Sequence, residues 1–328
     1  MSMTKSAKFG RFMKFTAIAL ASAFALTACG ESAADSGNGA DATGDDAPAA
    51  SGEVITLTGV PAEEAAALVS KFELLMEVIE SETGREVEFQ SSTDYAAVIE
   101  ALIAGQADMA IGSPFTYVRA GDQGADVEVL GGRVEEKGDE LGYVSYALVT
   151  PDSDITSLAD TAGRPVCYVD QGSTSGFLYP SAGMLDAGLD PIDDVDAIFA
   201  GSHDGAVLAL LDGQCDLAFA YDSMVEVLMP GRGELEESQY EVIWESAVIP
   251  ASPIFMNNGT LDEGTQDTLR GMFQDGLINI EALAEAGYCE SEAECALPED
   301  SYEYAPVEDS IYDGIREVCE ITQAEACA

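Results

Sequence analysis

Short apolar runs alternate with longer segments of helical spacing from Val54 onward. Runs at residues 54–57, 109–111 and 148–150 have the length of buried strands, whereas residues 65–80 place their apolar side chains three and four positions apart. An alternation of short strands with helices is typical of βαβ units. The pattern therefore predicts α/β lobes with mainly parallel sheets.

One helix–turn–strand pattern occurs twice. The segment from Tyr95, YAAVIEALIAGQADMAIGS, matches HDGAVLALLDGQCDLAFAYD from His203, and each copy predicts a helix, a Gly-Gln turn and a buried strand. Convergent use of a common pattern is the alternative to a true repeat. If each copy belongs to one lobe, both helix N-termini face a cleft between the lobes, where their unpaired N–H groups favour a small anion.

The first 28 residues have the features of an export signal. Four basic residues precede an apolar run, residues 15–26, that is too short for a permanent membrane span. The run ends in LTAC, which resembles the bacterial lipobox; an ordinary cleaved signal with a chance cysteine is the alternative. We expect cleavage of residues 1–28, acylation of Cys29, and a disordered acidic tether over residues 29–52.

The chain is strongly acidic. It has 61 Asp and Glu against 13 Lys and Arg, a formal net charge of −48. Removal of the signal leaves 9 basic residues against the same 61 acidic ones, or −52. We expect no nucleic-acid partner, because phosphate backbones need clustered Lys and Arg. The charge favours solubility and says little about a ligand.

Apart from Cys29, the chain has six cysteines, an even number in an exported protein. Of the possible pairings we favour three disulfides: Cys167–Cys215, Cys289–Cys295 and Cys319–Cys327. A zinc site is the alternative, but the sequence contains no C-x-x-C pair and its single histidine, His203, is distant from most of the cysteines. We therefore expect no metal, and we expect no other cofactor.

The stretch QGSTSGFLYP, residues 171–180, places three consecutive hydroxyl side chains between two glycines. It follows a predicted strand at residues 165–169 and precedes a predicted helix at residues 177–185, an arrangement that can surround tetrahedral oxygens with N–H and O–H groups. Helix capping is the alternative, but one cap needs one hydroxyl. A hydrolase elbow, G-x-S-x-G, is not matched because Thr174 is at the centre, so we do not expect an enzyme.

Five segments together closely resemble the phosphonate-, phosphite- and phosphate-binding proteins of ABC importers, the PhnD-like family. They are TDYAAVIEALIAGQADMAIGSPFTYV, LGYVSYALV, DQGSTSGFLYPSAGML, GSHDGAVLALLDGQCDLAFAYDS and VIWESAVIPASPI. The resemblance extends over nearly all of residues 54–285. It implies an α/β type 2 periplasmic-binding fold with two lobes that close on a ligand. Lobe 1 would comprise residues 53–147 and 244–328, with a disulfide-clipped C-terminal region, and lobe 2 residues 148–243.

Carried over to this sequence, the resemblance implies seven ligand-binding residues. They are Ser173, Thr174 and Ser175 in the oxygen-binding loop, Tyr95, Tyr143 and His203 as further donors, and Asp222 near the substituent on phosphorus. Core tyrosines and a structural histidine are the alternatives for the donors. We expect a site without Lys or Arg, in which about four to six hydrogen bonds of about 1.5–3 kcal/mol each suffice for a micromolar site, which needs about 8 kcal/mol.

The segment IPASP, residues 249–253, bears on the choice of ligand. Relatives that bind amino-substituted phosphonates tend to have an acidic residue before the second proline, whereas this chain has Ser252. The departure disfavours an aminoalkylphosphonate and leaves phosphate, phosphite or a small alkylphosphonate. Asp222 is then a candidate acceptor for the proton of a monoprotonated oxyanion, which would disfavour a fully deprotonated ion such as sulfate.

The expected function is capture of a phosphorus oxyanion and its delivery to an ABC permease, without bond chemistry. The protein would be a monomer, tethered by its lipid to the outer face of the cell membrane. A ligand-sensing subunit of a membrane signalling receptor with the same fold is one alternative, and a secreted phosphoesterase is a less favoured one. The region around residues 289–327 has no assigned role.

Overall fold

Two β-sheets organise the chain, and the central strands of each are apolar. The computed structural model describes residues 54–62, 72–323 and 327. β9 (Leu217–Tyr221) and β12 (Pro253–Asn257) are buried along their whole length, as expected for strands covered on both faces. The predicted signal, Cys29 and the predicted tether lie outside the described residues.

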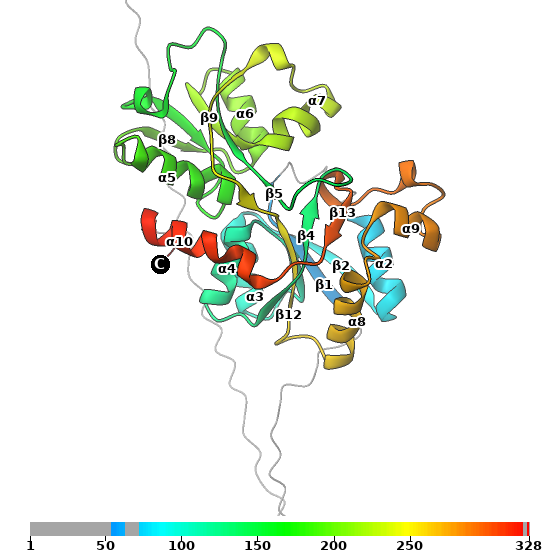
Figure 1. Ribbon diagram of the computed structural model, residues 1–328. Coiled ribbons are helices and arrows are strands. Elements are labelled where there is room, and N and C mark those ends of the chain that lie inside the picture. Colours follow the sequence, from blue (N-terminus) through cyan, green and yellow to red (C-terminus); the bar gives the residue numbers. More distant parts are fainter. Residues whose placement is uncertain (1–53, 63–71, 324–326, 328) are drawn as a thin grey trace, which may run out of the picture. The chain divides into compact units, whose positions relative to one another are not determined.

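The first sheet has six strands in the order β13-β4-β12-β3-β1-β2 (Figure 1). Besides β12 they are β1 (Val54–Gly59), β2 (Glu86–Ser91), β3 (Met109–Ile111), β4 (Val127–Val134) and β13 (Glu303–Ala305). Its helices are α2 (Glu73–Thr83), α3 (Tyr95–Ile103), α4 (Pro114–Asp122), α8 (Glu263–Gln274) and α9 (Ile280–Ala286). We call this sheet and its helices the first lobe.

The second sheet has five strands in the order β10-β6-β9-β7-β8. Besides β9 they are β6 (Ser145–Val149), β7 (Pro165–Tyr168), β8 (Asp196–Phe199) and β10 (Glu241–Glu245). Its helices are α5 (Tyr179–Asp186), α6 (His203–Leu211) and α7 (Met229–Arg232), with π-helical turns η2 (Thr174–Leu178) and η3 (Met224–Leu228) before α5 and α7. We call this sheet and its helices the second lobe.

Short elements complete the chain. An antiparallel pair, β5 (Gly142–Tyr143) and β11 (Ile249–Pro250), lies where the chain passes from one lobe to the other. The 3₁₀ turns are η1 (Leu158–Thr161), η4 (Glu237–Gln239), η5 (Glu292–Glu294), η6 (Pro298–Asp300) and η7 (Asp309–Tyr312). The last helix is α10 (Asp313–Thr322).

The α/β prediction is confirmed, but the expectation of mainly parallel sheets is wrong. β1 pairs in parallel with β2 and β3, and β7 with β8 and β9. The pairs that involve β4, β12, β13, β6 and β10 are antiparallel. Parallel neighbours need a crossover connection, usually a helix. β4 is the last strand of the first lobe before the chain enters the second lobe at β6, and β10 is the last strand of the second lobe before the chain returns at β12. β6 and β12 therefore follow connections between the lobes and are not preceded by a crossover helix.

The repeat found in the sequence forms the same structure twice. α3 and β3 make one copy and α6 and β9 the other, each with its strand parallel to a neighbour in its own sheet. The turn glycines, Gly105 and Gly213, have φ angles of 65° and 71° in the left-handed region, where a residue without a Cβ is favoured. Each lobe therefore receives one copy, which meets the condition under which both helix starts were expected at one cleft.

The other predicted elements overlap the observed ones. The strands predicted at residues 54–57, 109–111, 148–150 and 165–169 correspond to β1, β3, β6 and β7. The helix predicted at residues 65–80 is described only from Glu73, because residues 63–71 lie outside the described part. The helix predicted at residues 177–185 falls on η2 and α5.

The six cysteines after Cys29 form the three predicted disulfides: Cys167–Cys215, Cys289–Cys295 and Cys319–Cys327. The first joins β7 to the residues just before β9, and both of its cysteines are buried. The other two close short loops near the end of the chain. The first disulfide therefore fixes one pair of neighbouring strands in the second lobe, and the other two lie in the C-terminal segment, which we define as residues 287–323 with residue 327.

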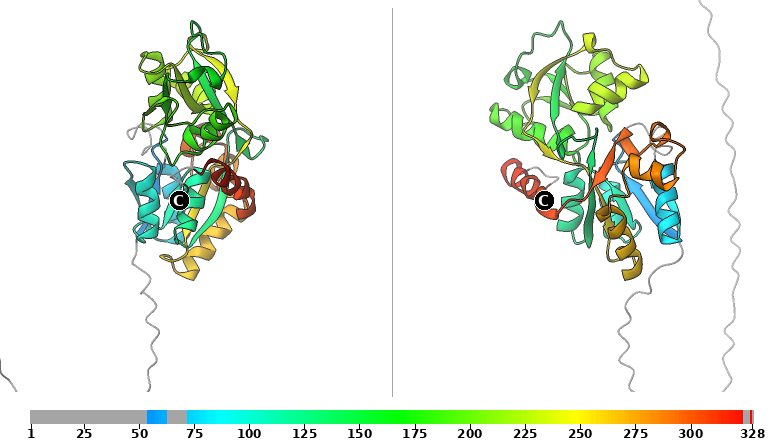
Figure 2. Two further views of the ribbon diagram at one scale, coloured as in Figure 1. Left: turned by 90° about the vertical axis from the view of Figure 1, so that its left-hand side faces the viewer. Right: turned by 45° about the vertical axis from the view of Figure 1, so that its right-hand side comes forward.

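The C-terminal segment contacts both lobes. β13 adds an edge strand to the first sheet, and α10 packs against α4 of the first lobe and α5 of the second (Figures 1 and 2). The hydroxyl of Tyr312 donates to the carbonyl of Ala251 at 3.0 Å. All described residues belong to one compact unit, residues 48–328. Within the part of the chain that the structure describes, no helix has the length and hydrophobicity of a membrane span.

Candidate functional site

The two copies of the repeat place their first helical residues at one cavity. Tyr95 begins α3 after the N-cap Asp94, and His203 begins α6 after the N-cap Ser202. In each case the side chain of the cap accepts a backbone N–H of the first turn. Tyr95 and His203 both line the cavity. The predicted meeting of the two helix starts is therefore observed.

The hydroxyl loop between β7 and α5 supplies two cavity-lining side chains. Ser173 Oγ accepts from the backbone N–H of Gly176 at 3.0 Å and lies 3.4 Å from Nε2 of His203. Ser175 contacts the hydroxyl of Tyr143. Helix capping was the alternative interpretation of this loop, and Ser173 does cap the turn. The same side chain also lines the cavity, so the two interpretations do not exclude each other for Ser173.

The two glycines of the loop are required by close packing. A Cβ at Gly172 would lie 2.6 Å from the Cβ of Tyr95 on the first lobe. A Cβ at Gly176 would lie 2.3 Å from the Cβ of Val169. Real side chains do not approach so closely, so only glycine lets the loop pack against α3 on one side and the end of β7 on the other.

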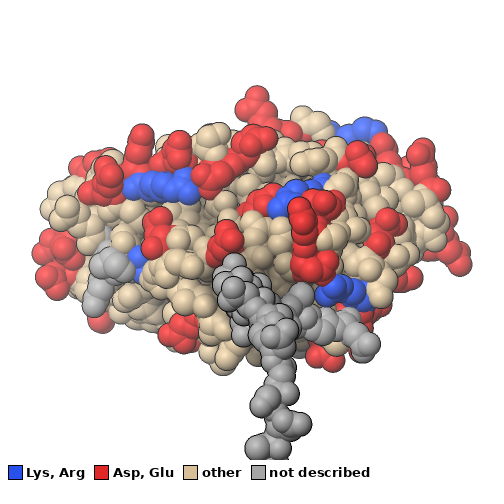
Figure 3. Space-filling view, turned by 90° about the horizontal axis from the view of Figure 1, so that it is seen from below, with Lys and Arg blue, Asp and Glu red and all other residues tan. Residues whose placement is uncertain are grey.

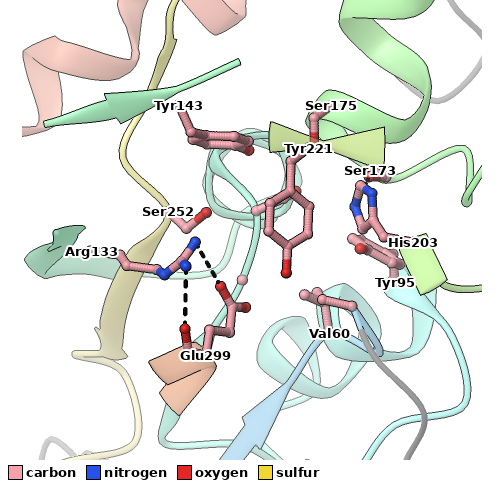
Figure 4. Close-up of a pocket in the computed structure, with 13 residues that line it drawn as sticks. Val60, Tyr95, Arg133, Tyr143, Ser173, Ser175, His203, Tyr221, Ser252 and Glu299 are labelled. Atoms are coloured by element: carbon pink, nitrogen blue, oxygen red, sulfur yellow. Dashed lines mark hydrogen bonds and ion pairs between the residues drawn. The ribbon is translucent and has the colours of Figure 1, made fainter. Parts of the chain in front are cut away.

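The cavity lies between the lobes and is lined by hydroxyl and aromatic groups (Figure 4). The space open to the centre of a water-sized molecule is about 20 Å³. Five of the seven predicted residues line it: Tyr95, Tyr143, Ser173, Ser175 and His203. Five further polar residues that the sequence analysis did not assign as ligand donors also line it: Ser113, Arg133, Tyr221, Ser252 and Glu299.

The tyrosine and histidine donors in the cavity are neutral. Burial raises the pKa of Tyr95 and of Tyr143, although contacts with serine hydroxyls oppose the shift, so both phenols keep their protons. Burial lowers the pKa of His203 to about 3, which leaves its ring uncharged. Its Nδ1 is buried without a hydrogen-bond partner among the described residues. The ring packs edge-on against Tyr221, with centroids 4.6 Å apart.

The expectation of a site without Lys or Arg is wrong, because Arg133 of β4 lines the cavity. Its Nη1 lies 3.1 Å from both Glu299 Oε2 and Glu135 Oε1, and its Nη2 donates to Ser223 Oγ and the carbonyl of Glu299, at 3.2 Å each. Burial disfavours the cation, but the carboxylates of Glu299 and Glu135 outweigh it and raise the pKa of Arg133. Each terminal nitrogen therefore already has two partners within the protein.

Two predicted residues do not reach the cavity. Thr174 Oγ1 accepts from the backbone N–H of Phe115 on the first lobe at 2.9 Å, so this hydroxyl joins the lobes. The carboxylate of Asp222 accepts from the backbone N–H groups of Val144 and Ser223 and lines a separate surface hollow. Burial, with the nearby charge of Glu135, raises the pKa of Asp222 to about 6. The geometry therefore does not support a ligand contact by either side chain.

The missed residues differ in how visible they are in the sequence. Arg133 lies in the apolar run VLGGRV, and a lone charge in a strand-like run indicates a buried, paired group. Ser252 and Tyr221 lie within the segments that carry the family resemblance. Glu299 has no such signal in the sequence, because no motif surrounds it. Its backbone φ of 57°, which is unusual for a residue with a Cβ, is visible only in the structure.

The outer surface opposes an anionic ligand. Figure 3 shows Asp and Glu spread over the face seen from below, with Lys and Arg in smaller patches. Exposed charges act over roughly 8 Å at physiological salt. The donors of the cavity are buried, so they are removed from this screening and face a ligand directly.

A family model described as "ABC transporter, phosphonate, periplasmic substrate-binding protein" matches residues 57–278. The chain is 41% identical over 284 residues to the phosphate-import protein PhnD of Mycolicibacterium smegmatis, which covers 84% of this chain and 88% of the relative. It is 27% identical to the phosphonates-binding periplasmic protein of Escherichia coli, over 60% of this chain and 58% of the relative.

Solved structures agree with the fold. The binding protein component of an ABC phosphonate transporter from Pseudomonas aeruginosa superposes with a TM-score of 0.70 at 24% identity, covering 82% of this chain and 86% of the other. PhnD1 from Prochlorococcus marinus, in complex with methylphosphonate, superposes with a TM-score of 0.69 at 17% identity, covering 83% and 99%. The predicted type 2 periplasmic-binding fold is confirmed.

Proposed function

The chain belongs to the family of periplasmic substrate-binding proteins of ABC phosphonate transporters, and we propose that its ligand is inorganic phosphate or an equally small phosphorus oxyanion. The relative at 41% identity is named for phosphate import, which favours phosphate within this class. The five predicted residues that line one cavity favour a tetrahedral anion.

The size of the cavity carries the proposal. A sphere of about 20 Å³ has a radius of about 1.7 Å, and adding a water radius of about 1.4 Å gives room for a ligand of roughly 3.1 Å radius. One tetrahedral phosphorus oxyanion is about that large. The space favours an ion of this size over a phosphonate with an aminoalkyl chain. Ser252 supplies no carboxylate for an ammonium group.

Capture would couple the ligand to closure of the lobes. Tyr95 belongs to the first lobe, whereas Ser173, Ser175 and His203 belong to the second, so an anion that bonds both sets stabilises the closed form. Each hydrogen bond to a charged ligand contributes about 1.5–3 kcal/mol. About four to six such bonds in a dry cavity would be enough for micromolar binding, which needs about 8 kcal/mol, before the entropy of association is counted.

The same proposal covers anchoring and delivery. We propose that Cys29 carries the lipid that holds the protein on the outer face of the cell membrane, and that the monomer hands its ligand to an ABC permease. The lipobox-like LTAC supports the anchor. Metabolic labelling with a radioactive fatty acid should mark the wild-type chain and leave C29A unlabelled; a labelled C29A would disprove the anchor.

Calorimetric titration tests the ligand. The mature chain, freed of ligand by unfolding and refolding, is titrated with phosphate, phosphite, methylphosphonate, aminoethylphosphonate and sulfate. We expect micromolar or tighter binding of phosphate or another of the small phosphorus oxyanions, and at least 100-fold weaker binding of aminoethylphosphonate. Flat traces with all three small phosphorus oxyanions would refute the proposal.

A further inference from the structure

One carboxylate projects into the cavity from the C-terminal segment. Glu299 lies on the turn η6, and its side chain is only 12% exposed. The turn is fixed on both sides, since Ser301 Oγ donates to the carbonyl of Pro298 at 2.6 Å and the N–H of Tyr302 donates to the carbonyl of Val134 at 2.9 Å. These hydrogen bonds therefore fix the position of Glu299 at the cavity.

Arg133 holds this carboxylate in one orientation. Figure 4 shows two contacts from Arg133 to Glu299, one to a carboxylate oxygen and one to the backbone carbonyl. The ion pair uses Oε2 of Glu299, and the other contacts of the terminal nitrogens go to Glu135 and Ser223. The terminal N–H groups of Arg133 thus all contact the protein, and the ion pair compensates the buried negative charge of Glu299.

The carboxylate is the odd group in a cavity of donors. Serine and tyrosine hydroxyls can donate to a ligand, and so can one nitrogen of His203, whereas an ionised carboxylate only accepts. Among the described residues that line the cavity, Glu299 is the acidic one. A ligand that fits this set must present oxygens to most of the wall and one proton to Glu299.

We propose that Glu299 determines specificity by accepting the proton of a P–OH group on the bound oxyanion, and that Arg133 is the positioning residue that orients it. The inference rests on the proposed function and takes over the role that the sequence analysis gave to Asp222. Hydrogen phosphate always carries such a proton near neutral pH. Sulfate and a dianionic alkylphosphonate carry no such proton, so their negative oxygens would be repelled by the carboxylate of Glu299.

Several groups around Glu299 have pKa values that lie outside the pH range in which the test is made. Burial raises the pKa of Tyr95, Tyr143 and Tyr304, and that of Arg133 is raised by its carboxylate partners. His203 is uncharged and Asp222 titrates near 6, below the test range. Glu135 and Tyr221 complete the set of facing groups. A pH dependence between 7 and 9 that is present in the wild type and absent from E299Q is therefore attributed to the proton that the ligand gives to Glu299.

Calorimetric titration of the mature chain with phosphate, methylphosphonate and sulfate tests this inference. For the wild type we expect phosphate to bind at least 100-fold more tightly than sulfate, and methylphosphonate to lose about tenfold in affinity per pH unit above its second ionisation. For E299Q we expect phosphate affinity to fall at least tenfold, about 1.4 kcal/mol. The phosphate-to-sulfate ratio should fall below ten, and the pH dependence with methylphosphonate should vanish.

E135Q is the matched control, because Glu135 lies at the same 3.1 Å from Arg133 Nη1 and does not line the cavity. It should keep the wild-type ratio within threefold. E299D, which retains a carboxylate, should keep a ratio above ten even if E299Q folds poorly. An E299Q protein that keeps the wild-type ratio, or an E135Q protein that loses it equally, would overturn the inference and leave phosphate binding intact. A wild-type chain that binds neither phosphate nor methylphosphonate would overturn both proposals.

Discussion

Replacing Thr174 with valine separates the two roles that this residue has been given. The family resemblance implies that its hydroxyl binds the ligand, whereas the structure places the hydroxyl on the backbone N–H of Phe115 across the two lobes. Valine has nearly the same shape but cannot accept a hydrogen bond. The two roles predict different effects on affinity and on selectivity.

The magnitude follows from the fate of the Phe115 N–H. In the closed form of T174V this buried donor has lost its partner, at a cost of about 1–3 kcal/mol. When the lobes separate, water takes over the donor, so the open form is hardly affected. For a ligand that binds only the closed form, the binding free energy is weakened by this whole amount. Affinity should therefore fall about 5- to 150-fold for every ligand, with ratios between ligands unchanged.

Calorimetry with phosphate and methylphosphonate measures both quantities, and the thermal midpoint of the ligand-free protein is the control. We expect the midpoint to change by less than about 2 °C, because the hydroxyl joins lobes and supports neither core. S173A is a useful comparison, since Ser173 caps a helical turn as well as lining the cavity and should lower both affinity and midpoint. A changed phosphate-to-methylphosphonate ratio in T174V, or an unchanged affinity, would refute the lobe-joining role.

Three further predictions concern the loop, the buried acid and a disulfide. G172A should weaken phosphate binding at least 100-fold in calorimetry with little change in the ligand-free midpoint, since its Cβ would lie 2.6 Å from that of Tyr95 and hold the lobes apart; wild-type affinity would show that the lobes do not close this far. Burial raises the pKa of Asp222 to about 6 from 3.8, so the stability present below pH 4 is lost as the pH rises through 6. In D222N the decrease in unfolding free energy between pH 4 and 7, measured by denaturant titration, should be smaller by about 1–3 kcal/mol. An unchanged decrease would contradict the raised pKa of Asp222. Removing Cys167–Cys215 by paired alanine substitutions should cost about 4 kcal/mol of unfolding free energy, because the bond closes 48 residues, and a loss below 1 kcal/mol would contradict the estimate.

Local patterns in the sequence carry much of the fold and part of the site. The repeat predicts that Tyr95 and His203 begin equivalent helices, and placing one copy in each lobe is enough to bring them to one cavity. The three disulfides follow from an even number of cysteines and two short spacings. These features depend on residues near one another in the chain or on a duplicated pattern, which is why a single sequence reveals them.

The remaining features depend on how distant segments meet. Ser173 and Ser175 face the cavity, whereas the hydroxyl of Thr174 turns towards Phe115, because α4 of the other lobe approaches it there. The antiparallel strands follow from the route of the chain between lobes. Glu299 reaches the cavity because a turn near the end of the chain is fixed between Pro298 and Tyr302, and neither spacing nor composition near residue 299 indicates that contact.

The place of Glu299 in the chain bears on how ligand preference can evolve. The turn η6 lies outside both sheets, between a small disulfide loop and the edge strand β13, so a substitution in it leaves the central strands unchanged. The donors of both lobes, by contrast, are built into helix starts and a glycine-bounded loop. A lineage could therefore exchange one oxyanion for another by altering a few residues of this turn while the transport machinery continues to meet the same two-lobed surface.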